Sequence, residues 1–413
     1  MRVNHTRISK VPTDWQILTL KELSSVAITN GLYKDKTHYG QGPFMVHMTE
    51  IFAYDIITNQ EMPQVLLTEK EKAKYLLKAG DLLFARRSLK PEGAGDVSIV
   101  FPTSEVSFES SIIRVRLIES IVFPKFAFYY LKSKMGKAQM MSIVRQVAVS
   151  GITGEDLKKY QIPLPPLAEQ KSIVNFLETW DVAIQKTEAL IAAKEKQFEW
   201  LCQCYFTFKN KDTAIWRCSK IGDFLMPRNE RAVPSKDLPL YSLTIDNGIT
   251  AKTDRYDREF LVKDKNSKAY KVVHPKDIVF NPANLRWGAI ARSEVSHKIV
   301  LSPIYEVFKV LENKIDGDYL TYALTCKRQI RIFATKTEGT LIERMGVKAD
   351  VFQLCEIMIP SKEKQTMIAQ TLSAARREIN LLKSLGVGYQ KQKHYLMQKL
   401  LSGELKVGGS SNG

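Results

Sequence analysis

Two short segments of the sequence, residues 85–90 and 281–288, combine guanidinium, amide and hydroxyl groups that are suited to hydrogen-bond with nucleic-acid bases. Arginine makes paired hydrogen bonds with guanine and asparagine makes them with adenine, whereas lysine mostly binds phosphates. Each segment follows a short apolar run that predicts a buried strand, and loops on a rigid frame commonly carry binding groups. The candidate nucleic-acid-binding residues are Arg86, Arg87, Ser88 and Lys90 in the first segment, and Asn281, Asn284, Arg286 and Trp287 in the second.

Four further residues are candidates for the same contacts. Tyr33 and Lys34 in the first half, and Arg228 in the second, each follow an amphipathic stretch that opens with a tryptophan. Tyr33 is equally consistent with a packed aromatic side chain of the core. Arg255 lies in the run 253–260 among three acidic residues, so a salt-bridged surface is the alternative for this residue.

The sequence lacks the usual motifs of catalysis. It contains no G-x-x-x-x-G-K-[ST] phosphate loop and no G-x-S-x-G turn. Residues 281–284 come closest to the N-P-P-[YF] loop of amino-methyltransferases, but the second proline and the aromatic residue are missing. The six histidines show no metal-ligand spacing. We therefore expect no catalytic residue, no cofactor and no metal, although scattered carboxylates leave a dispersed nuclease site open.

The charge of the 413-residue chain favours a polyanionic partner. Its 61 lysines and arginines exceed its 44 acidic residues, for a formal net charge of +17, and phosphates that are neutralised release counterions. Residues 1–165 carry 22 basic and 16 acidic side chains, 207–361 carry 26 and 19, and 362–413 carry 9 and 3. Residues 166–206, with 4 basic and 6 acidic side chains, instead favour contacts with protein. Charge alone leaves the partner open, because many basic proteins bind no nucleic acid.

Three compositional features bear on the location of the protein. No run of about 18 apolar residues predicts a membrane span. Residues 1–10 lack the apolar stretch of a secretory signal. The five cysteines lack the paired spacing of zinc sites and are expected to be reduced thiols. We therefore expect a cytoplasmic protein.

The elements that position the candidate residues occur twice, with a period of roughly 195 residues. Trp15 has a counterpart in Trp216, and the apolar run 75–84 has one in 270–280, which pairs Asp81 with Asp277. Residues 160–177 and 355–372 also align, so that Pro163 corresponds to Pro360 and Gln170 to Gln365. The chain is therefore a weak tandem duplication.

A long helix is predicted after each proline step. Apolar residues recur with alternating spacings of four and three from Ile173 to Tyr205, and again from Ile368 to Leu400, which is typical of a coiled-coil seam. Gly386 and Gly388 weaken the second seam. We expect an α+β protein in which two globular domains, related by pseudo-twofold symmetry, are separated by two long antiparallel helices. The alternative is a single large domain that contains two ordinary long helices.

Segments of both copies resemble the specificity subunit of type I restriction-modification systems. The resemblance rests on the sequence GITGEDLKKYQIPLPPLAEQKSIVNFLETWDVAI over 151–184, on its counterpart over 338–372, and on LMQKLLSGELKV over 396–407. It implies target-recognition domains over 1–165 and 208–361, conserved helical regions over 166–207 and 362–407, and a disordered tail over 408–413. The distal copy departs from the pattern where it has Lys364 in the place of Glu169.

The resemblance also implies a function. A specificity subunit is a non-catalytic adaptor that binds a bipartite sequence of double-stranded DNA and docks methyltransferase subunits, here expected to be two per chain, with restriction subunits joining through the complex. Two alternatives stay open. One is a free-standing sequence-specific DNA-binding protein, and the other is a self-contained methyltransferase or nuclease with unrecognised motifs.

Overall fold

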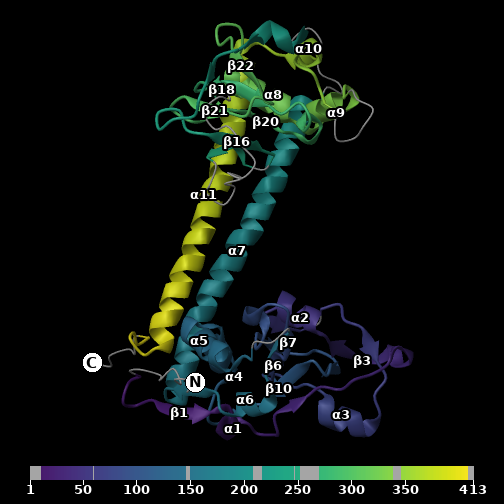
Figure 1. Ribbon diagram of the computed structural model, residues 1–413, viewed down its shortest axis with the longest axis vertical. Coiled ribbons are helices and arrows are strands. Elements are labelled where there is room, and N and C mark those ends of the chain that lie inside the picture. Colours follow the sequence, from purple (N-terminus) through teal and green to yellow (C-terminus); the bar gives the residue numbers. More distant parts are fainter. Residues whose placement is uncertain are drawn as a thin grey trace. The chain divides into compact units, whose positions relative to one another are not determined.

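The computed structural model describes residues 11–58, 60–145, 149–207, 216–245, 247–251, 269–337 and 346–407. Contacts divide the chain into two compact units (Figure 1): unit 1 consists of residues 1–187 and 385–413, and unit 2 consists of residues 188–384. Each unit contains a β-rich globular part and a portion of each of two long helices. The candidate Arg255 and the predicted tail lie outside the described residues. The predicted domain boundaries stay predictions.

A five-stranded sheet with the order β2-β10-β6-β8-β4 lies in unit 1. Strands β4 and β8 are parallel, and the other neighbours are antiparallel. A three-stranded sheet, β5-β3-β9, and two ribbons, β1-β12 and β11-β7, complete the β structure described for this unit. The strands are β1 (Gln16–Thr19), β2 (Thr29–Asn30), β3 (Tyr39–Val46), β4 (Ile56–Ile57), β5 (Gln64–Val65), β6 (Leu82–Ala85), β7 (Arg87–Ser88), β8 (Val97–Val100), β9 (Val106–Phe108), β10 (Ile112–Val115), β11 (Ser150–Gly151) and β12 (Gln161–Leu164).

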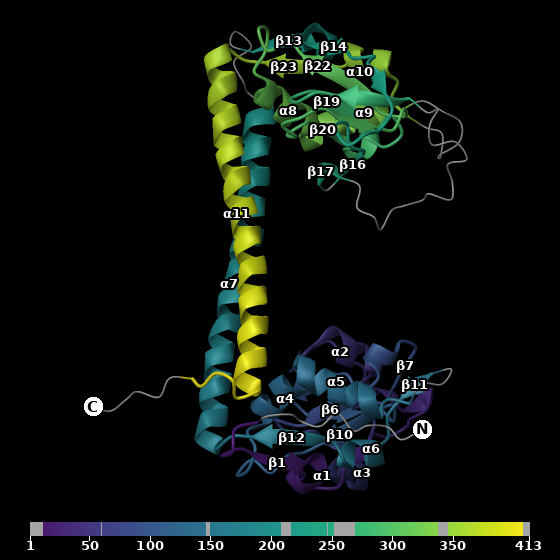
Figure 2. The same ribbon diagram turned by 60° about the vertical axis from the view of Figure 1, so that its left-hand side comes forward.

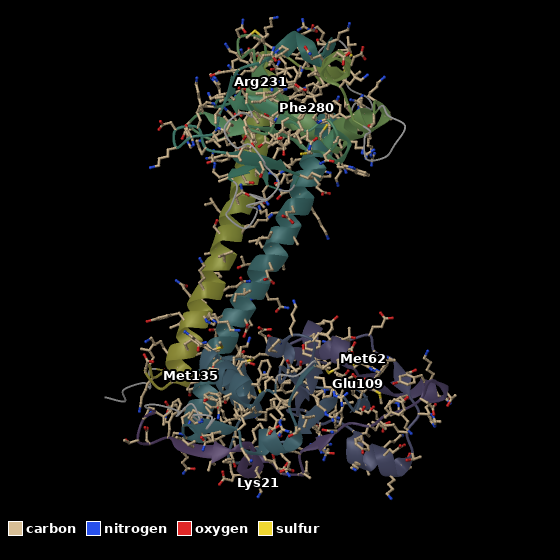
Figure 3. The ribbon with its side chains drawn as sticks, in the orientation of Figure 1. Lys21, Met62, Glu109, Met135, Arg231 and Phe280 are labelled. Carbon is tan, nitrogen blue, oxygen red and sulfur yellow. The ribbon has the colours of Figure 1, made fainter. Side chains whose placement is uncertain are left out.

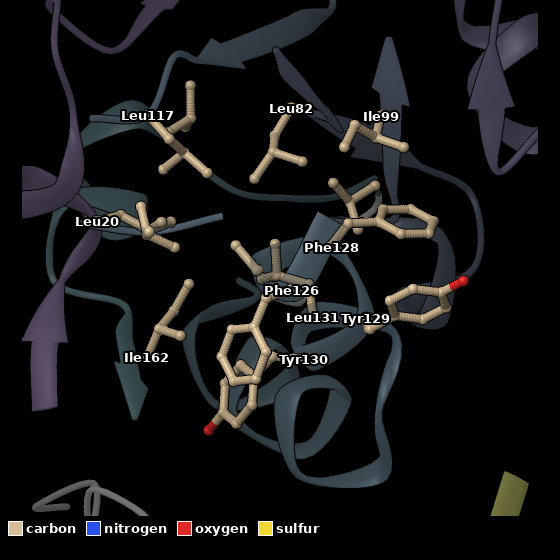
Figure 4. Close-up of a cluster of buried hydrophobic side chains, with 14 of the residues drawn as sticks. Leu20, Leu82, Ile99, Leu117, Phe126, Phe128, Tyr129, Tyr130, Leu131 and Ile162 are labelled. Carbon is tan, nitrogen blue, oxygen red and sulfur yellow. The ribbon is translucent and has the colours of Figure 1, made fainter. Parts of the chain in front are cut away.

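Helix α4 (Pro124–Lys132) supplies the aromatic part of the core of unit 1. Phe126 and Tyr130 are almost completely buried, and they belong to one cluster with Leu82 and Ile99 from the sheet (Figure 4). The other helices described in this unit are α1 (Leu20–Leu23), α2 (Met48–Ala53), α3 (Glu69–Tyr75), α5 (Lys134–Ile143) and α6 (Gly154–Lys158), with 3-10 turns η1 (Lys36–His38) and η2 (Pro91–Gly93).

Unit 2 has a four-stranded antiparallel sheet with the order β14-β22-β19-β20, a three-stranded sheet β15-β18-β21, and ribbons β16-β17 and β13-β23. Phe280 of β19 is fully buried (Figure 3) and packs against Phe352, with ring centroids 4.4 Å apart. The described strands are β13 (Arg217–Lys220), β14 (Leu225–Pro227), β15 (Arg231–Ala232), β16 (Tyr241–Thr244), β17 (Gly248–Ala251), β18 (Tyr270–Val273), β19 (Ile278–Phe280), β20 (Ile290–Arg292), β21 (Ile299–Leu301), β22 (Glu306–Val310) and β23 (Glu356–Ile359). The described helices are α8 (Gly317–Thr325), α9 (Lys327–Thr335) and α10 (Ala349–Leu354), with 3-10 turns η3 (Ile221–Phe224) and η6 (Leu285–Trp287).

The predicted internal duplication is confirmed by the equivalent elements of the two units. Trp15 and Trp216 are both 6% exposed, and each precedes the first strand of an equivalent antiparallel ribbon, β1-β12 or β13-β23. The predicted buried strands are β6 and β19, which lie between β10 and β8 and between β22 and β20. Two consecutive helices follow each sheet, α4 and α5 in unit 1 and α8 and α9 in unit 2.

The two long helices are α7 (Leu167–Phe206) and α11 (Lys362–Leu401), each of 40 residues. Within each unit they pack side by side and antiparallel (Figures 1 and 2). In unit 1 the Trp180 ring packs edge-on against Tyr389, at 5.8 Å between centroids. In unit 2 Lys194 forms an ion pair with Glu378 at 2.8 Å. The α+β class with two long antiparallel helices is therefore confirmed.

The predicted seam faces inward on both helices. Ile173, Leu177, Ile368 and Leu372 are at most 1% exposed. Helix α11 continues without a break through Gly386, where an added methyl carbon would lie 3.7 Å from Thr187 Cγ2. Gly386 therefore does not end the second helix, and a methyl group at this position would make an ordinary contact with Thr187.

The acidic side chains of α7 have intramolecular partners, which differs from the sequence-based interpretation that they favour contacts with other proteins. Glu178 forms an ion pair with Lys125, and Asp181 with Lys393 of α11. In unit 2 Glu195 pairs with Lys383 of α11 at 2.7 Å. Much of the negative charge of α7 is therefore compensated by the basic charge of α11. It no longer identifies a docking surface.

Three further findings concern the described residues alone. None of their helices combines the length and apolar character needed to cross a membrane. They contain no group of three or more His, Cys, Asp or Glu side chains that could hold a metal ion. All five cysteines lie within the described ranges and are free thiols.

Candidate nucleic-acid interface

One buried aspartate directly precedes β6 and another directly precedes β19. Each anchors the strand that leads into a candidate segment. Asp81 accepts two hydrogen bonds from the Arg116 guanidinium, both at 2.7 Å. Asp277 accepts two from Arg228, at 2.5 and 2.9 Å. Each aspartate also accepts the backbone N–H of the residue three positions earlier, at 2.8 and 2.9 Å. The candidate Arg228 is thus engaged within unit 2, and its guanidinium serves to hold β14 to β19.

The candidate segments lie at equivalent places in the two units. Residues 86–96 connect the antiparallel neighbours β6 and β8, and residues 281–289 connect β19 and β20. A later part of the chain returns to each connection and donates a backbone hydrogen bond to it. The N–H of Ile152 bonds to the Arg86 carbonyl at 3.0 Å, and the N–H of Val347 bonds to the Pro282 carbonyl at 3.0 Å. A backbone hydrogen bond from a later segment therefore holds each connection at the edge of its sheet, at the same place in both units.

The connection in unit 1 is more ordered than the predicted loop. Arg87 and Ser88 form β7, which pairs with β11. The Ser88 hydroxyl accepts the Lys90 N–H at 3.1 Å, which shapes the turn that follows. Within the described residues no hydrogen bond or ion pair engages the guanidinium of Arg86 or of Arg87. Together with the exposed ammonium of Lys90, these groups form a surface rich in hydrogen-bond donors.

The connection in unit 2 contains the 3-10 turn η6. Asn281 accepts the N–H of Ala283 through its side-chain oxygen at 3.1 Å, and the Asn284 carbonyl accepts the N–H of Trp287 at 2.9 Å. Gly288 has a φ of +96°, which an L side chain rarely adopts. These constraints present a 63% exposed Trp287 beside Arg286, whose guanidinium carbon lies 5.2 Å from the centre of the indole ring. The exposed indole can stack on bases, and the half-buried arginine beside it can hydrogen-bond to them.

The remaining candidates differ in accessibility. Tyr33 is 81% exposed, so the alternative of a packed core aromatic does not hold for its side chain. Lys34 forms an ion pair with Glu71 at 2.8 Å. The hydrogen bond from Lys34, together with one from the Thr68 backbone, lowers the pKa of Glu71 to about 2. Lys34 is therefore held by a carboxylate, whereas Tyr33 is available to a ligand.

Arg145 belongs to the same surface of unit 1, although sequence reasoning missed it. Gly151 of β11 pairs with Arg87 on one side and with Arg145 on the other. The Arg145 side chain is 66% exposed and bonds to Asp156 at 2.9 Å. Nothing in the spacing links residue 145 to residue 87, because their proximity depends on how β11 returns to β7. The period of the duplication was the one signal that could have drawn attention to this region, because it relates the segment that follows α5 to the segment that follows α9.

Comparison with known proteins gives a family match over part of the chain and relatives along nearly all of it. The family model described as "Type I restriction modification DNA specificity domain" matches residues 12–194. The MjaX type I restriction enzyme specificity subunit of Methanocaldococcus jannaschii is 24% identical over 97% of this chain and 96% of its own length. Over residues 12–194 the chain thus matches a type I restriction modification DNA specificity domain, and along almost its whole length it is similar to a type I restriction enzyme specificity subunit.

Solved structures of type I restriction-modification systems share the fold of this chain. The S subunit from M. genitalium superposes with a TM-score of 0.57 over 95% of this chain and 98% of that chain, at 13% identity. A chain from a study of complex assembly and conformational transition of the type I R-M system superposes with a TM-score of 0.58, at 17% identity. It covers 96% of this chain and 100% of that chain.

The motif that carries the family resemblance has a structural basis in both copies. Pro166 immediately precedes α7, where the absent N–H of proline costs no helical hydrogen bond. The glutamine that follows is buried in both copies, with Gln170 1% and Gln365 3% exposed. The residue before it differs between the copies: Glu169 stands in the first copy, and in the second the Lys364 ammonium lies 5.6 Å from the centre of the Trp216 ring. The departure at Lys364 therefore leaves the start of α11 intact.

Proposed function

We propose that each unit of this specificity subunit recognises one half of a bipartite sequence in double-stranded DNA. The observation that carries the proposal is the equivalence of the two connections, β6 to β8 and β19 to β20, each of which is held by a backbone hydrogen bond from a later segment. Each presents arginine at the rim of a sheet, and arginine makes paired hydrogen bonds with guanine. In this proposal Arg86 and Arg87 bind bases or phosphates of one half-site, and Asn284, Arg286 and Trp287 bind the other. Tyr33, Ser88, Lys90, Asn281 and Arg255 remain further candidates.

The long helices are proposed to determine the spacer and to dock methyltransferase subunits. A continuous 40-residue helix extends roughly 60 Å at 1.5 Å per residue, so it is stiff and long enough to separate two half-sites by about one turn of DNA, ~34 Å. Trp200 of α7 is 61% exposed and Leu381 of α11 is 64% exposed, both within unit 2. Exposed apolar side chains on a helix support a protein-binding surface. Because the helical region occurs twice, we propose two methyltransferase subunits per chain, with restriction subunits joining through them in a cytoplasmic complex.

Mapping methylated bases tests this function. The chain is co-expressed with methyltransferase subunits of its own system, and every methylated base in the host genome is then located. We expect a single motif of two half-sites at a fixed spacing that disappears when the specificity subunit is deleted. A contiguous motif, or methylation that is unchanged by the deletion, would contradict the proposal.

Two simpler assays separate this function from its alternatives. The purified chain alone, incubated with DNA and labelled S-adenosylmethionine, is expected to transfer no methyl group, whereas a self-contained methyltransferase would do so. Purification of the tagged chain from its native host is expected to retain a methyltransferase. A free-standing DNA-binding protein would be recovered alone and would still bind DNA specifically.

A further inference from the structure

The two equivalent glutamines near the start of the long helices make the same unusual set of contacts. Gln170 of α7 donates from Nε2 to the Pro165 carbonyl at 2.9 Å, and Gln365 of α11 donates to the Pro360 carbonyl at 2.9 Å. Each side-chain oxygen accepts a backbone N–H from the start of the first helix after the sheet. Phe123 donates to Gln170 at 2.8 Å. The counterpart in unit 2 is the N–H of Asp316, which donates to Gln365 at 2.9 Å.

These contacts join two parts of a unit that have separate tasks. Pro165 directly follows β12, where the chain leaves the globular part and enters α7, while Phe123 is the N-cap of α4, which packs on the sheet. In unit 1 Gln170 also donates to the Ile121 carbonyl at 3.1 Å. This one side-chain amide therefore makes three hydrogen bonds, one to Pro165 and two to the segment that leads into α4. Amides buried this deeply are costly to leave unpaired, and a tilt of the helix would break several of these bonds at once.

A second set of contacts supports the same junction in each unit. Tyr129 of α4 donates a hydrogen bond to Asp181 of α7 at 2.6 Å. Near the start of α11, Thr366 donates to the Asp316 carboxylate at 3.1 Å. In both units the helix is therefore attached to α4 or α8 beyond its covalent connection.

We propose that Gln170 and Gln365 are positioning residues that fix the angle at which α7 and α11 leave their globular parts, and that they thereby restrict the spacer between the two half-sites. This inference rests on the proposed function, because a spacer exists only if the DNA target is bipartite. Neither glutamine contacts the candidate interface. Their effect reaches DNA through the orientation of the helices.

The test is a binding selection from duplex DNA with a randomised central region, performed with the full chain in complex with its methyltransferase subunits. Gln170→Met and Gln365→Met keep the size of the side chain and remove both its donor and its acceptor. We expect both variants to select the wild-type half-sites with a broadened distribution of spacers. The preference for the native spacer over spacers one base pair shorter or longer should fall roughly tenfold, as expected when one or two hydrogen bonds no longer oppose a distortion. Gln185→Met, at an exposed position of α7, is the matched control and should leave the spacer distribution unchanged.

A purely structural role for the glutamines predicts a different result. In that case affinity would fall equally for every spacer, and the distribution would keep its shape, which overturns the proposal. Gln170→Glu and Gln365→Glu keep the acceptor and lose the donor, so they should give intermediate spacer distributions and serve if a methionine variant does not fold. If the wild-type complex selects no bipartite motif at all, the proposed function fails. If it selects one and all four variants preserve its spacer, only the role of the glutamines is refuted.

Discussion

At the scale of single residues, Asp81 and Asp277 combine full burial with a complete set of partners. A buried carboxylate is tolerated when charge-assisted hydrogen bonds replace its hydration, and here a guanidinium and a backbone N–H do so in each unit. The arginine comes from a different element in each copy: Arg116 follows β10, and Arg228 follows β14. The aspartate position is therefore shared by the copies, while the position of its partner is not.

Replacement of Asp277 by asparagine is expected to destabilise unit 2 by about 3 kcal/mol, because it leaves the Arg228 guanidinium without a buried counter-charge. Urea unfolding of the variant and of the wild type measures the difference. Asp237→Asn, at an exposed position, is the control and should change stability by less than about 0.5 kcal/mol. A loss at Asp277 no greater than that of the control would mean that the ion pair contributes little.

The arginines of the two connections are expected to act on separate half-sites. Arg86→Ala should relax the base preference of one half-site, and Arg286→Ala that of the other, with a loss of about 1 to 3 kcal/mol per paired contact. Binding to a panel of targets with single base substitutions measures this. An equal weakening of all targets by either change would instead identify that arginine as a phosphate ligand.

His47 and Glu109 provide a pH-dependent contribution to the stability of unit 1. The hydrogen bond that His47 Nδ1 makes to the Glu109 carboxylate, at 3.0 Å, raises the pKa of His47 above its ordinary value of 6.5, even though burial opposes this. The stabilisation from protonated His47 is therefore complete below about pH 6.5 and is lost as the pH rises through the raised pKa. We expect the stability difference between wild type and His47→Gln to shrink from pH 6 to pH 8. His394→Gln on the exposed face of α11 is the control, and a difference that is independent of pH would refute the linkage.

At the scale of elements, the long helices were the most predictable part of the chain. A seam repeated over 40 residues gives an unambiguous period, and its positions are buried or half-buried. The strands after each turn signal were also predictable, because Asp81 and Asp277 each introduce a run of buried apolar residues. By contrast, β7 was not predictable. Its partner β11 lies about 60 residues away, and no local pattern distinguishes Arg87 and Ser88 from a loop.

The candidate interface shows the same limit. Composition identified the basic connections, but the role of Arg228 as the partner of Asp277 and the position of Arg145 near Arg87, on the other side of Gly151, both depend on contacts that are distant in sequence. The glutamines of the proline steps were recognisable as a motif from the duplication. Their contacts with Phe123 and Asp316 became apparent only from the folded chain.

Gly386→Ala is expected to stabilise the helix pair by about 1 kcal/mol, since alanine removes the helix penalty of glycine and its methyl group meets Thr187 at an ordinary contact distance. Gly388→Ala, with no atom within 4 Å of the added carbon, should give a similar gain and serves as the control. Denaturant unfolding measures both. Destabilisation at Gly386 alone would show that the helices pack more closely there than the contact distance indicates.

At the scale of the whole molecule, the proposed assembly with methyltransferase subunits depends on surface that the chain itself leaves uncovered. Trp200→Glu should weaken binding of the methyltransferase by about 2 kcal/mol or more, roughly thirtyfold, because exposed tryptophans commonly dominate interfaces. Gln197→Glu adds the same charge at an exposed position of α7 and should have little effect. Co-purification and titration with the methyltransferase measure both, and equal effects would remove Trp200 from the docking surface.

The antiparallel ribbon of β1 and β12 has a consequence for how such a protein changes over generations. Gln16 lies opposite Leu164, and Arg217 opposite Ile359, so both ends of each globular part meet at one ribbon. A stretch of gene that encodes everything between the two strands can be exchanged for another by recombination while the ribbon and the helix that follows keep their register. The ribbons and long helices are thereby inherited separately from the recognition surface. A lineage can then acquire a new target while it keeps the same fold.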